Sequence, residues 1–253
     1  MNETDKTDWT GATVALTCGS IILLFSLGIR HTFGLFLQPI TLDQGWGRET
    51  FALSIAIQNL VWGFSQPIAG MIADRVGAKA IVAIGALCYG LGLWTMSHVT
   101  EELLFILSSG VLIGLGLSGT TFPVIFGAIS RLVSPEKRSL AMGLTMSVGS
   151  FGQFAMLPIS LGLITGLEWQ SALILLSILA ILMFPLAFGI RPASPHTSFA
   201  AKDVSVKKAV QDVFGTRDFG FSPLGFRIAL SLILAVLNCL FSERTLAVRR
   251  TQA

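Results

Sequence analysis

Arg30 and His31 are the residues with the clearest chemical potential, because they lie inside the first long apolar stretch of the chain. A guanidinium binds carboxylates through a planar fork of donors, and an imidazole exchanges a proton near neutral pH. A charge among apolar residues is costly and is kept for function. Arg30 is therefore a candidate contact for a small organic anion, and His31 a candidate carrier of a coupled proton. Alternatively, Arg30 reaches the headgroups or pairs with Glu49, and His31 is a hydrogen-bonded interfacial histidine.

Polar and aromatic side chains recur at helical spacing in two other apolar stretches. The first set is Gln58, Asn59, Trp62 and Gln66, and the second is Ser147, Ser150 and Gln153. Such stripes either line a path for a solute or join helices by side-chain hydrogen bonds. Gln58, Asn59, Trp62 and Gln153 are the predicted contacts along the path.

Other kinds of chemistry have no candidate residues. The apolar stretches hold no paired carboxylates, catalytic triad or phosphate loop, so the sequence does not predict an enzyme. A Gly-x-Gly-x-x-Gly pattern at residues 114–119 lies inside an apolar stretch rather than at a strand-to-helix turn, and it predicts close helix packing instead of nucleotide binding. Cys18, Cys88 and Cys239 lack metal-ligand spacing. We therefore expect no metal and no cofactor.

The elements that position these residues are membrane-spanning helices. The chain is 53% hydrophobic and 12% charged, whereas soluble domains carry about 25% charged residues. Its net charge of +3, without a basic patch, does not indicate nucleic-acid binding. Stretches of about 18 or more apolar residues predict an all-α protein within the lipid bilayer. They cover residues 11–37, 51–73, 80–97, 103–126, 140–166 and 171–190, with a weaker seventh candidate at 224–241.

The distribution of basic residues predicts the orientation. Eleven Lys and Arg residues fall in the N-terminal segment and in the loops after the second, fourth and sixth stretches, whereas the alternate loops hold only Arg48. The positive-inside rule then places the N-terminus in the cytoplasm of a multi-pass protein of the cell membrane. An internal repeat of stretches one to three in stretches four to six is also visible. Thr32-Phe33 corresponds to Thr121-Phe122, and inverted three-helix repeats of this kind are common in transporters.

A short hinge between the second and third stretches, residues 70–79, concentrates charge at the membrane face. It contains Gly70, Asp74, Arg75, Gly77 and Lys79. The charges need partners at this depth. Gly70 would allow a neighbouring helix to come close, and Gly77 would allow a turn with positive φ.

The hinge pattern Gly-x-x-x-Asp-Arg-x-Gly-x-Lys resembles the signature loop of the major facilitator superfamily. Residues 30–39 and 45–49 also resemble the first hairpin of its monocarboxylate transporter and oxalate/formate antiporter branch. The resemblance covers residues 9–222. It implies two six-helix halves that give alternating access to a central cavity. It also implies a gate in which Asp74 pairs with Arg75 and with the other half, near a further partner among Arg131 to Arg138.

The resemblance predicts secondary transport of a monocarboxylate or another organic anion. A drug efflux transporter is a less favoured alternative, because Gly110 stands where exporters carry an arginine and residues 149–152 lack the exporters' proline. Another alternative is a six-helix membrane protein that acts as a homodimer or as a non-transporting partner. The small anion, a coupled proton and a second six-helix half are the expected partners.

The predicted organisation has three parts. Residues 1–190 form the six-helix bundle, 191–223 a cytoplasmic loop, and 224–253 an atypical tail with a partial seventh helix. As a span, the tail would carry Arg244, Arg249 and Arg250 outside, against the charge asymmetry of the other loops. An interfacial amphipathic helix, or a truncated or frameshifted reading frame, fits these charges better, and the second is preferred. The chain is then the N-terminal half of a transporter.

Overall fold

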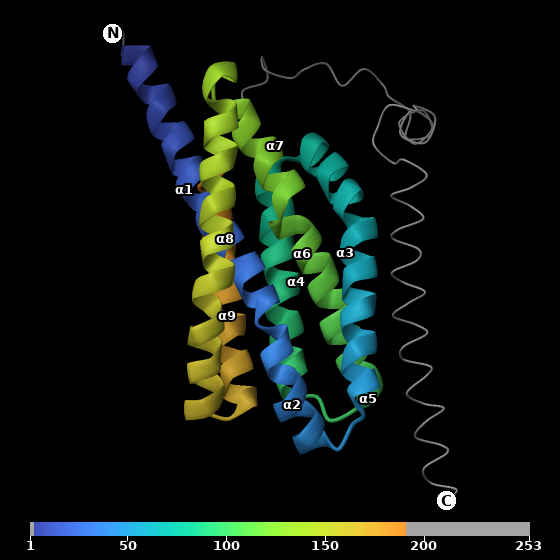
Figure 1. Cartoon of the computed structure of the whole chain (residues 1–253). Helices are drawn as coiled ribbons and strands as arrows, with labels where there is room; N and C mark the ends of the chain where they lie inside the picture. Colours follow the sequence, from blue (N-terminus) through green and yellow to red (C-terminus); the bar gives the residue numbers. More distant parts are fainter. Residues whose placement is uncertain (1–2, 191–253) are drawn as a thin grey trace, which may run out of the picture. The chain divides into compact units, whose positions relative to one another are not determined.

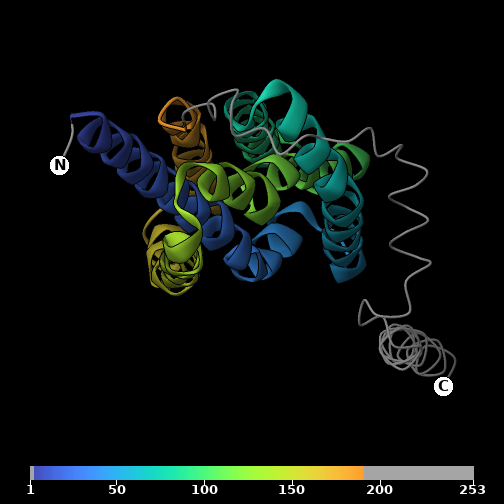
Figure 2. The same ribbon diagram turned by 90° about the horizontal axis from the view of Figure 1, so that it is seen from above.

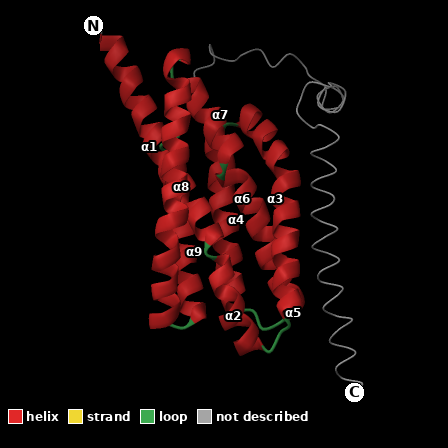
Figure 3. Ribbon diagram, viewed as in Figure 1, coloured by secondary structure: helices red, strands yellow, loops and turns green. Residues whose placement is uncertain are grey.

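The computed structural model describes residues 3–190, with side chains from Gly11 onward, and every element in this part is helical (Figures 1 and 3). The predicted all-α fold is confirmed. The elements are α1 (Glu3–His31), α2 (Phe33–Gln44), α3 (Arg48–Val76), α4 (Ala78–His98), α5 (Glu102–Ile106), the π-helical turn η1 (Leu107–Leu112), α6 (Ile113–Thr120), α7 (Phe122–Leu132), α8 (Pro135–Gly166) and α9 (Trp169–Ala187).

Each of the six predicted stretches corresponds to one helix or to one run of helices. The first is α1 with α2, and the fourth is α5 through α7. Five helical segments within residues 3–190 are long and apolar enough to cross a membrane: Gly11–His31, Ala78–His98, Glu102–Leu132, Pro135–Gly166 and Trp169–Ala187. The 29-residue α3 covers the second predicted stretch but is not among them, and it carries the three amides Gln58, Asn59 and Gln66 within its apolar part.

The helices pack side by side as a bundle, seen along the helices in Figure 2. The most extensive packing joins α1 to α8 and α4 to α9, and α6 packs against both α3 and α4. Glycines permit the approach of α6. A methyl group added at Gly114 would lie 2.9 Å from Val61 Cβ of α3, and one at Gly116 would lie 2.7 Å from the backbone nitrogen of Tyr89 in α4. The prediction that these glycines serve helix packing is confirmed.

Two membrane helices are interrupted at the Thr-Phe pairs of the predicted repeat. Between α1 and α2, Thr32 turns its hydroxyl to the Ile29 carbonyl at 2.8 Å. Between α6 and α7, Thr121 has extended backbone, and its hydroxyl donates to the Leu117 carbonyl at 2.7 Å. Pro123, in the first turn of α7, lacks the N–H that a continuous helix would require. Interrupted helices in matching positions are typical of inverted-repeat transporters.

The cytoplasmic loop predicted at residues 191–223 and the tail predicted at 224–253 lie outside the described residues.

Candidate functional site

Arg30 lies near the C-terminal end of α1, two residues before the interruption at Thr32, and its side chain is partly buried. Its Nη2 donates a hydrogen bond to Asn59 Oδ1 of α3. Its Cζ lies 5.5 Å from the centroid of the Trp62 ring, a cation–π distance. Asn59 is itself held by a 2.9 Å hydrogen bond to the Ile55 carbonyl. The guanidinium is therefore oriented by Asn59 and Trp62, and the described residues show no ion pair between Arg30 and Glu49.

Thr121, at the interruption between α6 and α7, extends this group. Its hydroxyl oxygen accepts hydrogen bonds from Trp62 Nε1 at 3.1 Å and from Gln66 Nε2 at 3.3 Å. Arg30, Trp62 and Thr121 thus form a chain of contacts across α1, α3 and the start of α7. Neither Thr121 nor Gln66 was predicted as a site residue. The available signal for Thr121 was its place in the Thr-Phe pair of the repeat.

Gln58, predicted together with Asn59 and Trp62 as a contact along the path, does not contact this group in the structure. Its side chain is fully buried, and Nε2 donates to the Ser109 carbonyl of η1 at 2.8 Å. Gln58 Oε1 has no hydrogen-bond partner among the described residues. Gln58 is one residue, or about 100° of helix, away from Asn59, and this rotation directs it into the packing between α3 and η1. Its side chain joins α3 to η1, which is the other role that the sequence left open for this stripe.

The other two predicted contacts, His31 and Gln153, stand apart from the Arg30 group. His31 is exposed, and Gln153 on α8 is partly buried. Within residues 11–190, neither takes part in a hydrogen bond to Arg30, Asn59 or Trp62. The alternative in which a hydrogen bond holds His31 likewise receives no support from these contacts.

The hinge between α3 and α4 has the geometry that the sequence predicts at Gly77. This residue has φ of +104°, which an L side chain rarely adopts, and its N–H donates to the Ala73 carbonyl at 2.9 Å. Gly70 is different. A methyl group there would meet only Pro123 Cβ, at an ordinary 3.7 Å, so helix packing does not require a glycine at this position.

Asp74 forms an ion pair with Arg131 Nη2, from the last turn of α7. The family resemblance implied Arg75 as its partner, and Arg75 is instead exposed. The Lys79 ammonium lies 4.0 Å from the centroid of the Phe188 ring. Arg138, in the first turns of α8, has a buried Nε without a hydrogen-bond partner in the described part of the chain, and it does not contact Asp74. Of the predicted gating residues, the structure brings together Asp74 and Arg131.

The 11-residue helix α7 connects the two groups. It begins directly after Thr121, which accepts hydrogen bonds from Trp62 and Gln66, and it carries Arg131 one residue before its end. A cavity of about 230 Å³ is lined by both members of the ion pair and, among others, by Arg75, Gly77 and Pro123. The Arg30 group and the hinge are thus joined by one short, continuous helix.

Comparison with known proteins matches the Major Facilitator Superfamily over residues 16–247, which includes most of the tail that the sequence resemblance left out. Monocarboxylate transporter 13 of Rattus norvegicus is 30% identical over 169 residues, 66% of this chain and 39% of that protein. The putative niacin/nicotinamide transporter NiaP of Bacillus subtilis is 32% identical over 145 residues, 57% of this chain and 36% of that protein. The chain spans less than half the length of these curated relatives. It belongs to the Major Facilitator Superfamily, a family of membrane transporters, and has the fold of its N-terminal half.

Proposed function

We propose that this chain is half of a secondary transporter that carries a small organic anion of the monocarboxylate class by alternating access. The proposal rests on the position of Arg30, a partly buried cation within a membrane helix. Asn59 and Trp62 hold its guanidinium in one orientation. An intramembrane charge that is costly to keep, and that is fixed in place, fits a binding role. The name of the rat relative agrees with this substrate class.

The guanidinium suits a carboxylate for geometric reasons. It has five N–H donors, of which the contact with Asn59 uses one. A carboxylate can accept two parallel charge-assisted hydrogen bonds from the remaining donors. Trp62 covers the guanidinium and limits its movement, so less conformational entropy is lost when the anion binds.

The helix α7 would couple anion binding at Arg30 to gating at the hinge, because it begins after Thr121 and carries Arg131. In the described conformation the Asp74–Arg131 pair holds the end of α7 against the hinge. When an anion binds at Arg30, a shift of Trp62 would move Thr121 and hence the start of α7. The pair would then break as the transporter changes state. Both charges are considerably exposed, 59% for Asp74 and 38% for Arg131, so the pair is weak enough to open during a transport cycle.

The orientation proposed from the sequence is consistent with the charges of the bundle. Among residues 11–190, five of the seven Lys and Arg side chains lie at the end that holds the hinge and the loop between α7 and α8, and five of the seven acidic side chains lie at the opposite end. The positive-inside rule assigns the first end to the cytoplasm, together with the N-terminus, in the cell membrane.

The proposal is tested by uptake of a radiolabelled short monocarboxylate, such as lactate, into proteoliposomes. One preparation contains this chain, and the other contains the chain extended by a second six-helix half from a monocarboxylate transporter. We expect uptake above protein-free liposomes only for the extended protein, because a central cavity needs both halves. Equal uptake by the two preparations would contradict the half-transporter proposal.

A further inference from the structure

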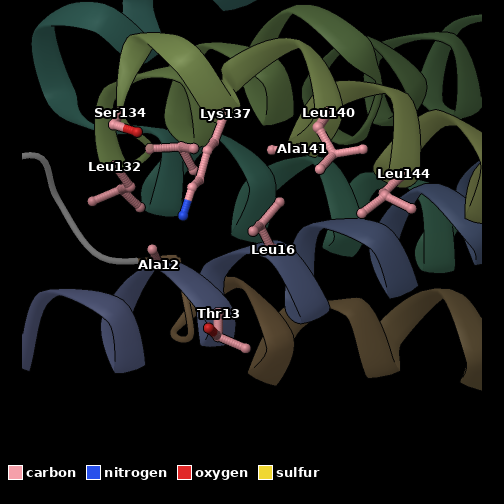
Figure 4. A pocket seen from close by; sticks show the side chains of 10 residues that line it. Ala12, Thr13, Leu16, Leu132, Ser134, Lys137, Leu140, Ala141 and Leu144 are labelled. Atoms are coloured by element: carbon pink, nitrogen blue, oxygen red, sulfur yellow. The ribbon is translucent and has the colours of Figure 1, made fainter. Parts of the chain in front are cut away.

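The surroundings of α1 differ between its hinge end and the turn that leads to Arg30. Toward the hinge, α1 borders a cavity of about 340 Å³ between α1, α7 and α8, with mainly apolar walls (Figure 4). Around Ser26, one helical turn before Arg30, the helix is instead bonded to α4 and α6 through hydroxyl groups. The three side chains involved are fully buried: Ser26, Tyr89 and Thr120. Specific hydrogen bonds therefore fix α1 directly before its charged residue.

Tyr89 of α4 bonds to the backbone of this turn. Its hydroxyl donates to the Ser26 carbonyl at 3.1 Å. In an α-helix the carbonyl of residue i accepts the N–H of residue i+4, so the same carbonyl belongs to the backbone bond of Arg30. A carbonyl oxygen has two lone pairs and can accept both bonds. The backbone of Arg30 is thus held from α4, while its guanidinium contacts Asn59 and Trp62 of α3.

The side chain of Ser26 adds a second connection, to α6. Its hydroxyl lies 2.8 Å from the Thr120 hydroxyl, which donates its own hydrogen to the Gly116 carbonyl at 2.9 Å. Because a hydroxyl has one hydrogen, Ser26 is the donor to Thr120. Thr120 directly precedes Thr121, whose hydroxyl accepts the bond from the Trp62 indole. This bond therefore connects α1 to the interruption between α6 and α7, where the indole is held.

Arg30 requires such an anchor because it lies in the last turn of α1, which ends at His31. The ends of helices fray, since their last carbonyl groups lack partners within the helix. A buried hydroxyl is also costly unless it is hydrogen-bonded. The chain has 18 phenylalanines and one tyrosine, Tyr89, so aromatic packing alone does not explain a hydroxyl at this position.

We propose that Tyr89 is a positioning residue for the anion site. Its bond to the Ser26 carbonyl holds the last turn of α1 in place, and this keeps the Arg30 guanidinium in the orientation that the anion requires. The inference rests on the proposed function of Arg30 as the anion contact. Tyr89 is fully buried, so it acts through Arg30 and not by contact with the anion. Without the hydroxyl the guanidinium samples other orientations, and the apparent affinity for the anion falls accordingly.

Uptake of radiolabelled lactate by the extended protein in proteoliposomes tests this role. Tyr89→Phe keeps the ring and removes the hydroxyl. We expect the KM for lactate to rise about fivefold, with the maximal rate within about twofold of the wild type. In the Arg30→Gln background the same substitution should raise KM less than about 1.5-fold, because Tyr89 acts through Arg30.

Thr145→Val is the matched control, because it also removes a buried hydroxyl that bonds to α1, at Ser20 and far from Arg30. Its KM should stay within about twofold of the wild type. A wild-type KM in Tyr89→Phe would overturn the proposal. A fivefold rise that persists in the Arg30→Gln background, or that also occurs in Thr145→Val, would overturn it as well.

Amide hydrogen exchange of the chain in nanodiscs gives a second readout, which requires neither lactate nor a second six-helix half. Tyr89→Phe should accelerate exchange in residues 27–31 by about threefold and leave the other helices unchanged. Thr145→Val should leave residues 27–31 unchanged. No acceleration in these residues, or acceleration throughout the chain, would overturn the positioning role. Accelerated exchange together with wild-type uptake in Arg30→Gln would instead contradict the anion contact and leave the positioning of Arg30 by Tyr89 standing.

Discussion

The side chain of Trp62 links Arg30 to Thr121, because its ring lies beside the guanidinium and its N–H bonds to the threonine hydroxyl. The indole N–H donates to Thr121, and this bond fixes the ring beside the guanidinium. The sequence predicted Arg30 because a charge inside an apolar stretch is costly, and Asn59 and Trp62 because they belong to a polar stripe at helical spacing. Thr121 could not be predicted in the same way. Its role depends on how the end of α6 meets α3, which is a property of packing and not of one helix.

Replacement of Thr121 by valine tests this arrangement, because valine keeps the shape and removes the acceptor. Trp62 and Gln66, which are partly buried, would lose their common partner, and an unsatisfied donor costs up to about 1–3 kcal/mol when it is shielded from water. We expect the free energy of unfolding to fall by about 2 kcal/mol in sodium dodecyl sulfate titrations of the purified chain. Thr121→Ser keeps the hydroxyl and should retain most of the wild-type free energy of unfolding. Thr165→Val, at an exposed threonine bonded only within its own helix, should change it little. A wild-type free energy of unfolding in Thr121→Val would contradict this arrangement of hydrogen bonds.

At the scale of helices, the glycines of α6 and the interruption before α7 determine where the site can form. The glycine pattern predicted close packing, and the structure confirms it. The interruptions were not predicted, because proline does not by itself break a membrane helix. Pro39, Pro67 and Pro158 all lie within continuous helices, whereas Pro123 follows a break. A proline leaves a backbone carbonyl without its usual N–H donor, and the neighbouring helices determine whether that carbonyl finds another partner.

The packing of α6 can be tested by Gly116→Ala. The added methyl group would meet the backbone of Tyr89 in α4, which cannot move without displacing the helix. Overpacking of this kind costs about 1–3 kcal/mol, and we expect that loss in the free energy of unfolding. Gly143→Ala, at a helical glycine with no heavy atom near the added methyl group, should be neutral or slightly stabilising. Equal stability of the two variants would show that α6 and α4 are farther apart than described.

The link from the hinge to α7 predicts a local change in dynamics. Asp74→Asn removes the ion pair that holds the last turn of α7, and exposed pairs contribute at most about 1 kcal/mol. Amide hydrogen exchange in residues 122–132 should therefore accelerate by up to about fivefold in nanodiscs. The double variant Asp74→Arg with Arg131→Asp should restore slow exchange. Glu136→Gln, a nearby carboxylate outside the pair, serves as the control. Unchanged exchange in Asp74→Asn would remove α7 from the gating proposal.

For the whole molecule, the length of the apolar stretches and the low fraction of charged residues were sufficient to predict an all-α membrane protein with six helical stretches. Both are averages over many residues, so they survive local irregularities such as the π-helical turn and the two interruptions. The contacts of single side chains are not averages. Gln58 and Asn59 are neighbours in sequence, yet one packs against η1 and the other contacts Arg30. Successive residues of a helix point about 100° apart, so Gln58 faces the helix packing while Asn59 faces Arg30.

The orientation can be measured by cysteine labelling in a variant without Cys18, Cys88 and Cys239. Glu101→Cys and Glu136→Cys place thiols at exposed helix starts on opposite ends of the bundle. A membrane-impermeant maleimide should label Glu101→Cys in intact cells, and Glu136→Cys only after the cells are lysed. The reverse pattern would place the hinge outside the cell.

The central claim, that Arg30 contacts the transported anion, is tested most directly by uptake of radiolabelled lactate into proteoliposomes with the extended protein. Arg30→Gln preserves polarity and removes the charge, so we expect initial uptake to fall at least about tenfold, since a charged hydrogen bond contributes about 1.5–3 kcal/mol. Arg48→Gln, an exposed arginine at the opposite end from the hinge, should transport normally at equal protein levels. Wild-type uptake by Arg30→Gln, or an equal loss in both variants, would contradict the account.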